Sequence, residues 1–169
     1  AGFNDIIYTF KLQEDGKILV GGNFTNFKGT FGSRIIRLNP DGSKDATFTT
    51  IGIGFNSTVF TLAQQTDGKI LIGGNFSTYN GGVENRIIRL NEDGTKDVTF
   101  NTGTGFNGRV DRVVLQTDGK ILVGGNFTTF NGNSQRYLIR LNENGTKDIS
   151  FIPFQNNEFL WTYTTDDAI

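Results

Sequence analysis

Residues 13–24 read QEDGKILVGGNF, and nearly the same string returns at residues 65–76 and again at residues 116–127. The copies are spaced by 52 and then 51 residues. Two further strings keep this spacing: Arg-Leu-Asn begins at positions 37, 89 and 140, and Gly-Phe-Asn begins at positions 2, 54 and 105. Three anchors that share one period show that the chain is built from tandem repeats.

The middle copy is typical of short antiparallel strands joined by tight turns. Residues 59–64 are rich in β-forming side chains, and Thr66-Asp67-Gly68 is a hairpin signal because Asp-Gly tolerates positive φ. Residues 69–72 form an apolar run that predicts a strand covered on both faces. After a loop, residues 86–91 and 96–100 predict a third and a fourth strand around a second Asp-Gly turn.

Four short strands in each repeat of about fifty residues predict an all-β chain made of β-propeller blades. A solenoid coil would be shorter, at about 20–30 residues, and a sandwich would not require such faithful repetition. The predicted units are blade 1 at residues 2–53, blade 2 at 54–104, blade 3 at 105–155, and the first strand of a partial fourth repeat at 156–169.

The motif Q-x-D-G-K-I-L-V-G-G-N-F, followed by R-I-x-R-L-N-x-D-G-[ST]-x-D-x-[ST]-F, resembles the delta-60 repeat over residues 2–151. The third copy departs from it at Asn144 and at Tyr137-Leu138-Ile139. The resemblance implies β-propeller blades in a bacterial surface, secreted or phage protein, and therefore an extracellular, cell-surface or virion location. It carries no catalytic motif. The kelch repeat is similar in period and in its Gly-Gly, but its spaced Tyr and Trp are missing here.

Propellers close with about four to eight blades, so three repeats are too few for a ring. One interpretation, which the sequence favours, is that the chain is part of a longer propeller protein. The other is that copies of the chain associate, so that two chains supply six blades. An open arc would expose apolar blade faces at both ends.

The composition excludes several kinds of function. Sixteen basic and 17 acidic residues leave a net charge of −1 with no basic block, which argues against binding to nucleic acid or a membrane surface. No apolar run is long enough to be inserted into a membrane. Cysteine, histidine and methionine are absent, which removes the usual zinc sites, thiol nucleophiles and Ser-His pairs.

Repeated acidic residues in turns suggest calcium loops or catalytic carboxylates. The string N-x-D-G-[ST]-x-D at residues 39–45 and 91–97 places oxygen ligands at alternate positions, but alignment with an EF-hand puts Arg37 or Arg89 at the first ligand position. A hairpin turn is therefore favoured, and no metal or cofactor is expected. Acids repeated in every copy indicate a scaffold, while Glu84, Asp111 and Glu158 are unrepeated and scattered. We expect no enzyme activity.

The loops after the second strand of each repeat are expected at the end opposite the Asp-Gly turns. They are poor in charge and differ between copies, and variable loops on a rigid scaffold are where binding is usually found. The aromatic series at positions 24, 76 and 127 and at positions 27, 79 and 130 could stack on sugars, although a core role is favoured. The candidate contact residues are Phe27, Lys28, Phe31, Tyr79, Asn80, Glu84, Phe130, Asn131 and Gln135.

These observations predict a non-enzymatic structural or binding module of a larger surface, secreted or virion-associated protein. It would mediate assembly or adhesion by contacting protein or carbohydrate through the loop face. Its other partners would be copies of itself or additional blades of the same polypeptide. The alternative is part of a propeller hydrolase or lyase whose active site is completed by other blades.

Overall fold

The computed structural model describes residues 2–48 and 53–153, and all regular elements in these ranges are β-strands. No helix in the described residues is long and apolar enough to cross a membrane. The predicted partial fourth repeat, residues 156–169, lies outside the described residues.

Each predicted blade contributes one three-stranded antiparallel sheet and one small hairpin. The first sheet has the order β1 (Ile7–Leu12), β2 (Ile18–Gly22), β5 (Ile35–Leu38). The second has β6 (Val59–Gln64), β7 (Ile70–Gly74), β10 (Ile87–Leu90). The third has β11 (Val110–Leu115), β12 (Ile121–Gly125), β15 (Leu138–Leu141).

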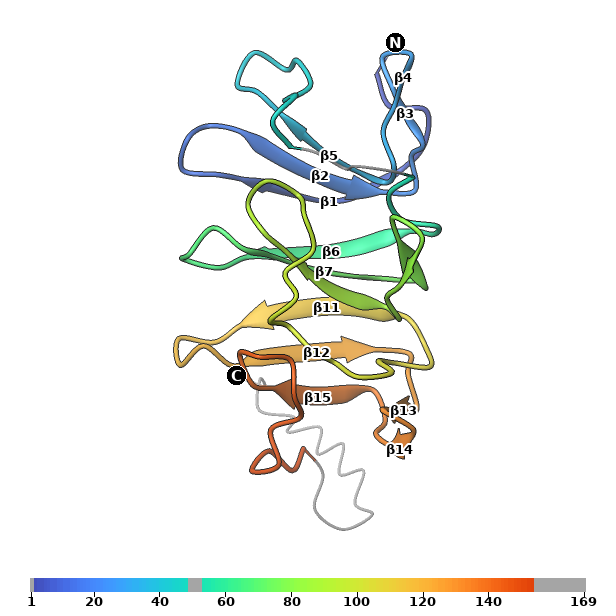
Figure 1. Ribbon diagram of the computed structural model, residues 1–169, viewed down its shortest axis with the longest axis vertical. Coiled ribbons are helices and arrows are strands. Elements are labelled where there is room, and N and C mark those ends of the chain that lie inside the picture. Colours follow the sequence, from blue (N-terminus) through green and yellow to red (C-terminus); the bar gives the residue numbers. More distant parts are fainter. Residues whose placement is uncertain (1, 49–52, 154–169) are drawn as a thin grey trace, which may run out of the picture.

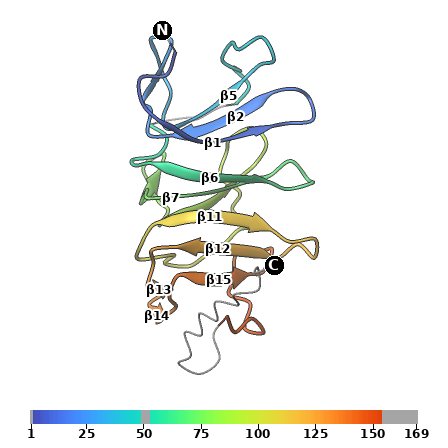
Figure 2. The ribbon, with the colours of Figure 1, turned by 180° about the vertical axis from the view of Figure 1, so that it is seen from behind.

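Along the chain, each hairpin lies between the second and third strands of its sheet. They are β3 (Asn26–Phe27) with β4 (Thr30–Phe31), β8 (Thr78–Tyr79) with β9 (Gly82–Val83), and β13 (Thr129–Phe130) with β14 (Asn133–Ser134). The three sheets are stacked along the long axis of the molecule, with the first strands β1, β6 and β11 in succession (Figures 1 and 2). The first Asp-Gly turns lie at one edge of the stack and the hairpins at the other (Figure 1).

The predicted fourth strand is reduced to a single bridge. In the middle repeat, Lys96 pairs with Leu90 and the ladder then stops. The side chain of Asp97 accepts a hydrogen bond from the backbone N of Thr99 at 2.9 Å, which bends the chain into a turn. Side-chain acceptors of this kind compete with a strand ladder for backbone donors, and here the aspartate wins in every copy.

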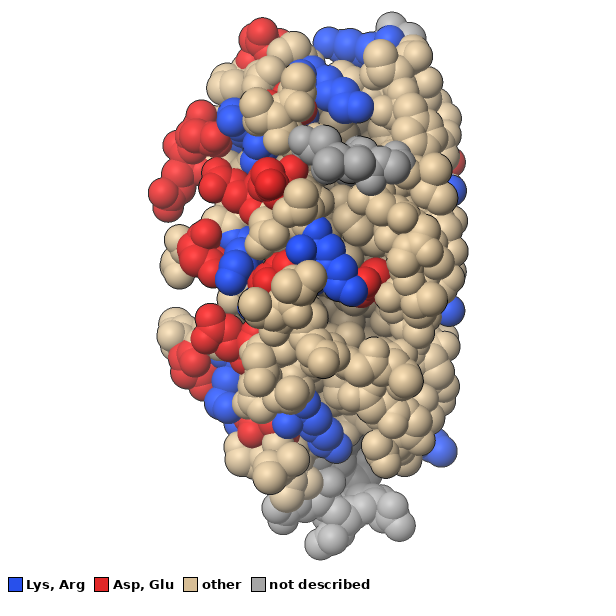
Figure 3. All heavy atoms as spheres, viewed as in Figure 1, with Lys and Arg blue, Asp and Glu red and all other residues tan. Residues whose placement is uncertain are grey.

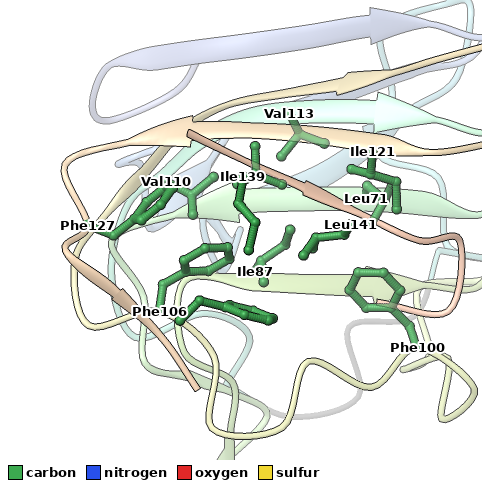
Figure 4. Close-up of a cluster of buried hydrophobic side chains, with 12 residues drawn as sticks. Leu71, Ile87, Phe100, Phe106, Val110, Val113, Ile121, Phe127, Ile139 and Leu141 are labelled. Carbon is green, nitrogen blue, oxygen red and sulfur yellow. The ribbon is translucent and has the colours of Figure 1, made fainter. Parts of the chain in front are cut away.

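The hydrophobic core lies between the sheets rather than within one of them. Strand β7 is buried on both faces, as its apolar run predicts, with Ile70, Leu71 and Ile72 fully inaccessible. In one cluster, Leu71, Ile87 and Phe100 of the second repeat pack against residues of the third repeat, among them Val110 and Phe127 (Figure 4). A single blade therefore cannot bury its own apolar surface, as expected for stacked repeats.

The repeated Gly-Gly marks two close approaches. A Cβ atom on Gly73 would lie 2.5 Å from Cγ1 of Val110 in the next sheet and 2.7 Å from Cγ2 of Thr61. A Cβ atom on Gly74 would lie 2.2 Å from the carbonyl oxygen of Thr58. The missing side chain at Gly73 therefore leaves room for a side chain of the neighbouring sheet. The missing side chain at Gly74 leaves room for the backbone at Thr58 of the same repeat.

We expect Gly73→Ala to destabilise the fold by about 1–3 kcal/mol, because the added methyl group overpacks a filled site. Urea unfolding followed by circular dichroism measures the change. Gly82→Ala is the matched control, since a Cβ atom there has its nearest neighbour at 3.5 Å. Equal stability of the two variants would contradict the close-approach explanation.

Candidate functional site

The loop face predicted from the sequence is an edge formed by three hairpins. Each hairpin turns through two residues with positive φ: Lys28-Gly29 at 49° and 84°, Asn80-Gly81 at 49° and 84°, and Asn131-Gly132 at 51° and 74°. These angles are those of a type I′ turn, which favours Asn-Gly and matches the twist of the flanking strands. The sequence therefore builds the same rigid support three times.

The side chains of Asn80 and Asn131 hold each hairpin to the segment that connects its sheet to the preceding one. Oδ1 of Asn80 accepts a hydrogen bond from the backbone N of Gly54 at 2.9 Å, and Oδ1 of Asn131 accepts one from Gly105 at 3.1 Å. Lys28 replaces asparagine in the first hairpin and remains exposed, while its Nζ donates to the carbonyl oxygen of Gly42 at 3.2 Å. Asn80 and Asn131 thus act in the turn, although they lie at the surface.

The structure corrects the prediction for three aromatic candidates. Phe27, Tyr79 and Phe130 are only 5%, 4% and 3% exposed, and each ring packs against the phenylalanine that begins its own repeat, at centroid distances of 4.6–4.8 Å. The Tyr79 hydroxyl donates to the carbonyl oxygen of Gly94 at 2.6 Å, and burial raises its pKa to about 12. These rings form the core and offer no surface for a sugar.

Two further candidates are engaged with their own repeat. The Glu84 carboxylate forms an ion pair with Lys96 of the segment that follows β10. Nε2 of Gln135 donates to the carbonyl oxygen of Leu138 at 2.6 Å. Phe31, in contrast, lies on β4 with 54% of its surface exposed. Of the nine predicted residues, Phe31 and Lys28 are the ones that best fit a contact surface.

Sequence reasoning missed the residues that match Phe31 in the other two hairpins. The second strand of each hairpin is exposed at both residues and reads Thr30-Phe31, Gly82-Val83 and Asn133-Ser134. Val83 is 73% exposed. The two residues that follow each Lys-Gly or Asn-Gly turn can be read from the sequence, and they differ in every copy. The edge is largely uncharged, whereas charged side chains gather at the opposite side (Figure 3).

The opposite edge carries the Asp-Gly turns and a groove between the first two sheets. The groove has a volume of about 530 Å³, and its acidic lining residues are Glu14, Asp15, Asp67 and Glu92. Oδ1 of Asp67 accepts a hydrogen bond from the backbone N of Lys69 at 3.1 Å, and its other oxygen lies 3.4 Å from Lys69 Nζ. Asp15 is held in the same way by Lys17. These two aspartates stabilise the turns.

The second Asp-Gly turns are closed by their own side chains. Oδ1 of Asp93 accepts hydrogen bonds from the backbone N and the hydroxyl of Thr95, at 2.9 and 2.6 Å. The last aspartate of the suspected calcium loop, Asp97, instead lies 2.7 Å from Nε of Arg89. Within residues 2–48 and 53–153, no three acidic side chains are grouped so that they could hold a metal ion. The hairpin interpretation accounts for these residues.

An arginine–aspartate ion pair recurs in each repeat; it is buried in the first two, and in the third the arginine side chain is 21% exposed. Nε of Arg37, Arg89 and Arg140 lies 2.7 Å from Asp45, Asp97 and Asp148, respectively. Burial alone would raise the pKa of Asp45 and Asp97, but hydrogen bonds from Thr47 or Thr99 and from the arginine outweigh it and lower the pKa. Hydrogen bonds from Ser150 and Lys120 lower the pKa of Asp148. The three carboxylates are thus held ionised as part of the scaffold.

A family model described as "Domain of unknown function (DUF5122) beta-propeller" matches residues 13–48, 65–100 and 116–151. These segments cover more than half of the chain. The chain belongs to this β-propeller family. Each match runs from the first Asp-Gly hairpin to the phenylalanine after the buried ion pair, so the family pattern contains the Gly-Gly, the arginine and the aspartate described above.

One solved structure with a similar chain is that of a protein of unknown function from Bacteroides caccae. It is 18% identical, and the alignment covers 82% of this chain and 46% of the other, with a TM-score of 0.43. This chain therefore spans less than half the length of that protein. No curated protein matches the sequence.

The ion pairs predict how stability depends on pH. Because the folded pKa of Asp45, Asp97 and Asp148 lies below the unfolded value of 3.8, their contribution to the free energy of unfolding is complete above that value and is lost as the pH falls below it. We expect the urea midpoint to fall as the pH is lowered from about 4 towards 2. Asp97→Asn should flatten this slope, because it removes one of the three groups. An unchanged slope in the variant would contradict this assignment.

Proposed function

We propose that this β-propeller chain is a non-catalytic binding module that contacts a protein or a carbohydrate through its hairpin edge, in the service of assembly or adhesion. The observation that carries the proposal is that β4, β9 and β14 present exposed, unrepeated residues on a support that is otherwise the same three times. Rigid scaffolds with variable exposed positions are the usual setting for recognition.

The chemistry of the edge favours a protein partner over a sugar. The aromatic rings that could have stacked on a sugar are in the core, which leaves Phe31 with the aliphatic Val83 and the polar pair Asn133-Ser134. An exposed aromatic residue on one hairpin and an exposed aliphatic residue on the next suit apolar patches on another protein. Carbohydrate is the second class of partner, because Phe31 follows Thr30 and pairs across the hairpin with Asn26, which supply a neutral hydroxyl and a neutral amide.

The proposal includes the narrower assignment of the repeat to the delta-60 type and of the chain to a larger surface, secreted or virion-associated protein. It is supported by the motif that runs from the glutamine before the first turn to the phenylalanine of the Asn-Phe pair, in all three copies. The recurring aspartates are occupied by turns and ion pairs, which supports a scaffold role for them rather than a catalytic one.

The double variant Phe31→Ser, Val83→Ser tests the hairpin edge. We expect the wild-type chain to bind members of a protein array or, failing that, a glycan array, and the double variant to bind at least about tenfold more weakly, as expected when an exposed apolar anchor is removed. Fluorescence titration of the strongest hits gives the affinities.

Val98→Ser is the matched control, because Val98 is 82% exposed but lies outside the hairpins. It should bind as the wild type does. Arrays that stay blank while the chain hydrolyses or eliminates a glycosidic substrate would overturn the proposal in favour of the enzyme alternative. Hits that the double variant binds as tightly as the control would place the contact surface elsewhere.

A further inference from the structure

The first strand of each sheet contains a β-bulge at the same place. In β6, the residues on either side of Phe60 pair with consecutive glycines of β7, so Phe60 is an extra residue without a partner in the ladder. Tyr8 of β1 and Asp111 of β11 are the corresponding extra residues. A bulge changes the direction of a side chain relative to the alternation of its strand, and bulges are common beside binding and active sites.

The bulge in the second sheet turns Phe60 out of the packed interfaces. Its neighbours Val59 and Thr61 are buried, at 0% and 3% exposure, whereas Phe60 is only partly buried. Hydrophobic clusters cover both faces of the second sheet, and neither cluster contains Phe60. Because this sheet has a neighbour on each side, the accessibility of Phe60 follows from the bulge itself.

The three extra residues and one neighbour form a continuous row across the sheets. The rings of Tyr8 and Phe60 meet edge to face, with centroids 5.0 Å apart and planes inclined by 71°. The guanidinium carbon of Arg109 lies 5.6 Å from the centroid of the Phe60 ring. Nε of Arg109 lies 2.8 Å from Oδ1 of Asp111. We call these four residues the bulge row.

The bulge row differs from sheet to sheet, although the backbone that carries it is the same three times. The bulge positions hold a tyrosine, a phenylalanine and an aspartate, and the positions that correspond to Arg109 hold Ile6 and Thr58. Asp111, an isolated acid in the sequence, thus finds its partner at the end of this row. Unrepeated, accessible side chains on a rigid frame are suited to recognition.

The chemistry of the bulge row matches that of a sugar. The ring of Tyr8 is exposed, and the side chains of Arg109 and Asp111 are 51% and 38% exposed. A guanidinium only donates hydrogen bonds and a carboxylate only accepts them, whereas a sugar hydroxyl does both. The C–H groups of a sugar ring are attracted to the negative face of an aromatic ring. The row therefore offers an aromatic surface beside a matched donor and acceptor.

The ion pair also indicates which ligands fit less well. The charges of Arg109 and Asp111 cancel, which favours a neutral ligand over an anion or a cation. An apolar protein surface would remove water from this pair and leave its remaining donors and acceptors without partners, which is costly. Hydroxyl groups replace the hydrogen bonds that the pair loses with water.

We propose that the bulge row binds a neutral oligosaccharide chain. The strands β1, β6 and β11 follow one another along the long axis of the molecule (Figure 1), so successive sugars would lie across successive sheets. Tyr8 and Phe60 contact the C–H groups of the sugars, and Arg109 and Asp111 hydrogen-bond to hydroxyl groups farther along the chain. The row is a second binding site, distinct in its residues from the hairpin edge.

An array of neutral glucans, mannans, galactans and xylans, followed by titration calorimetry of the strongest hit, tests the proposal. We expect the wild-type chain to bind and Tyr8→Ala to weaken binding at least about tenfold, because an aromatic contact is lost. Phe31→Ala is the matched control, since Phe31 is exposed to a similar extent, at 54% against 48% for Tyr8, but lies on a hairpin. It should bind the sugar as the wild type does, and both variants should keep the circular dichroism spectrum.

Asp111→Asn tests the polar part of the row. The substitution keeps the shape of the side chain but leaves the charge of Arg109 unbalanced. We expect the affinity for the neutral hit to fall about fivefold, as for the loss of one hydrogen bond. The affinity for an oligogalacturonate, whose sugars carry carboxylates, should rise relative to the wild type. A residue that only supported the bulge would not change the preference between the two sugars.

A blank array would overturn the proposal, as would wild-type affinity in Tyr8→Ala or an unchanged preference in Asp111→Asn. A loss in Phe31→Ala equal to that in Tyr8→Ala would assign the sugar to the hairpin edge and would also overturn it. Protein ligands of the hairpin edge should bind Tyr8→Ala as tightly as the wild type, so that the two sites are tested separately.

Discussion

The fold depends on the close approach of one sheet to the next at a residue without a side chain. Because Gly21 and Gly73 have no Cβ, the valine that begins the following sheet lies against the backbone of the second strand. That contact sets the separation of the sheets and therefore the thickness of the core between them. Protein interiors are packed so densely that even one added methylene group is felt, so this glycine cannot be replaced by a larger residue while the core stays filled.

The buried ion pair adds a polar constraint to this apolar one. An arginine in the third strand is costly to bury unless its charge is paired and its remaining donors are used. Asp97 pairs with Arg89, Thr99 accepts from Nη2, and Nη1 reaches the turn of the next repeat. The guanidinium thus fixes the fold of its own repeat and the registration of its neighbour at once. This explains why the charged residues of the motif are repeated as faithfully as the glycines.

The sequence was sufficient to predict the repeat, the all-β class and the strand buried on both faces, because each follows from periodicity or from a local apolar run. The prediction of a fourth strand is wrong beyond a single bridge. Its residues have strand propensity, but the Asp97 side chain captures the backbone N of Thr99, a competition that propensity does not describe. The site was predicted only in outline, because a ring such as Tyr79 can be assigned to the core or to the surface only when its neighbours in space are known.

Repetition itself separates the two roles of the residues in this chain. A side chain that recurs in every copy, such as the aromatic ring at position 27, 79 or 130, is required in every sheet because it is buried there. The second strands of the hairpins are free of this requirement, because their residues are exposed and change from phenylalanine to valine to serine between copies. The contacts between sheets and the hairpin edge are therefore independent surfaces: the first must stay constant for sheets to pack, and the second can vary to suit a partner.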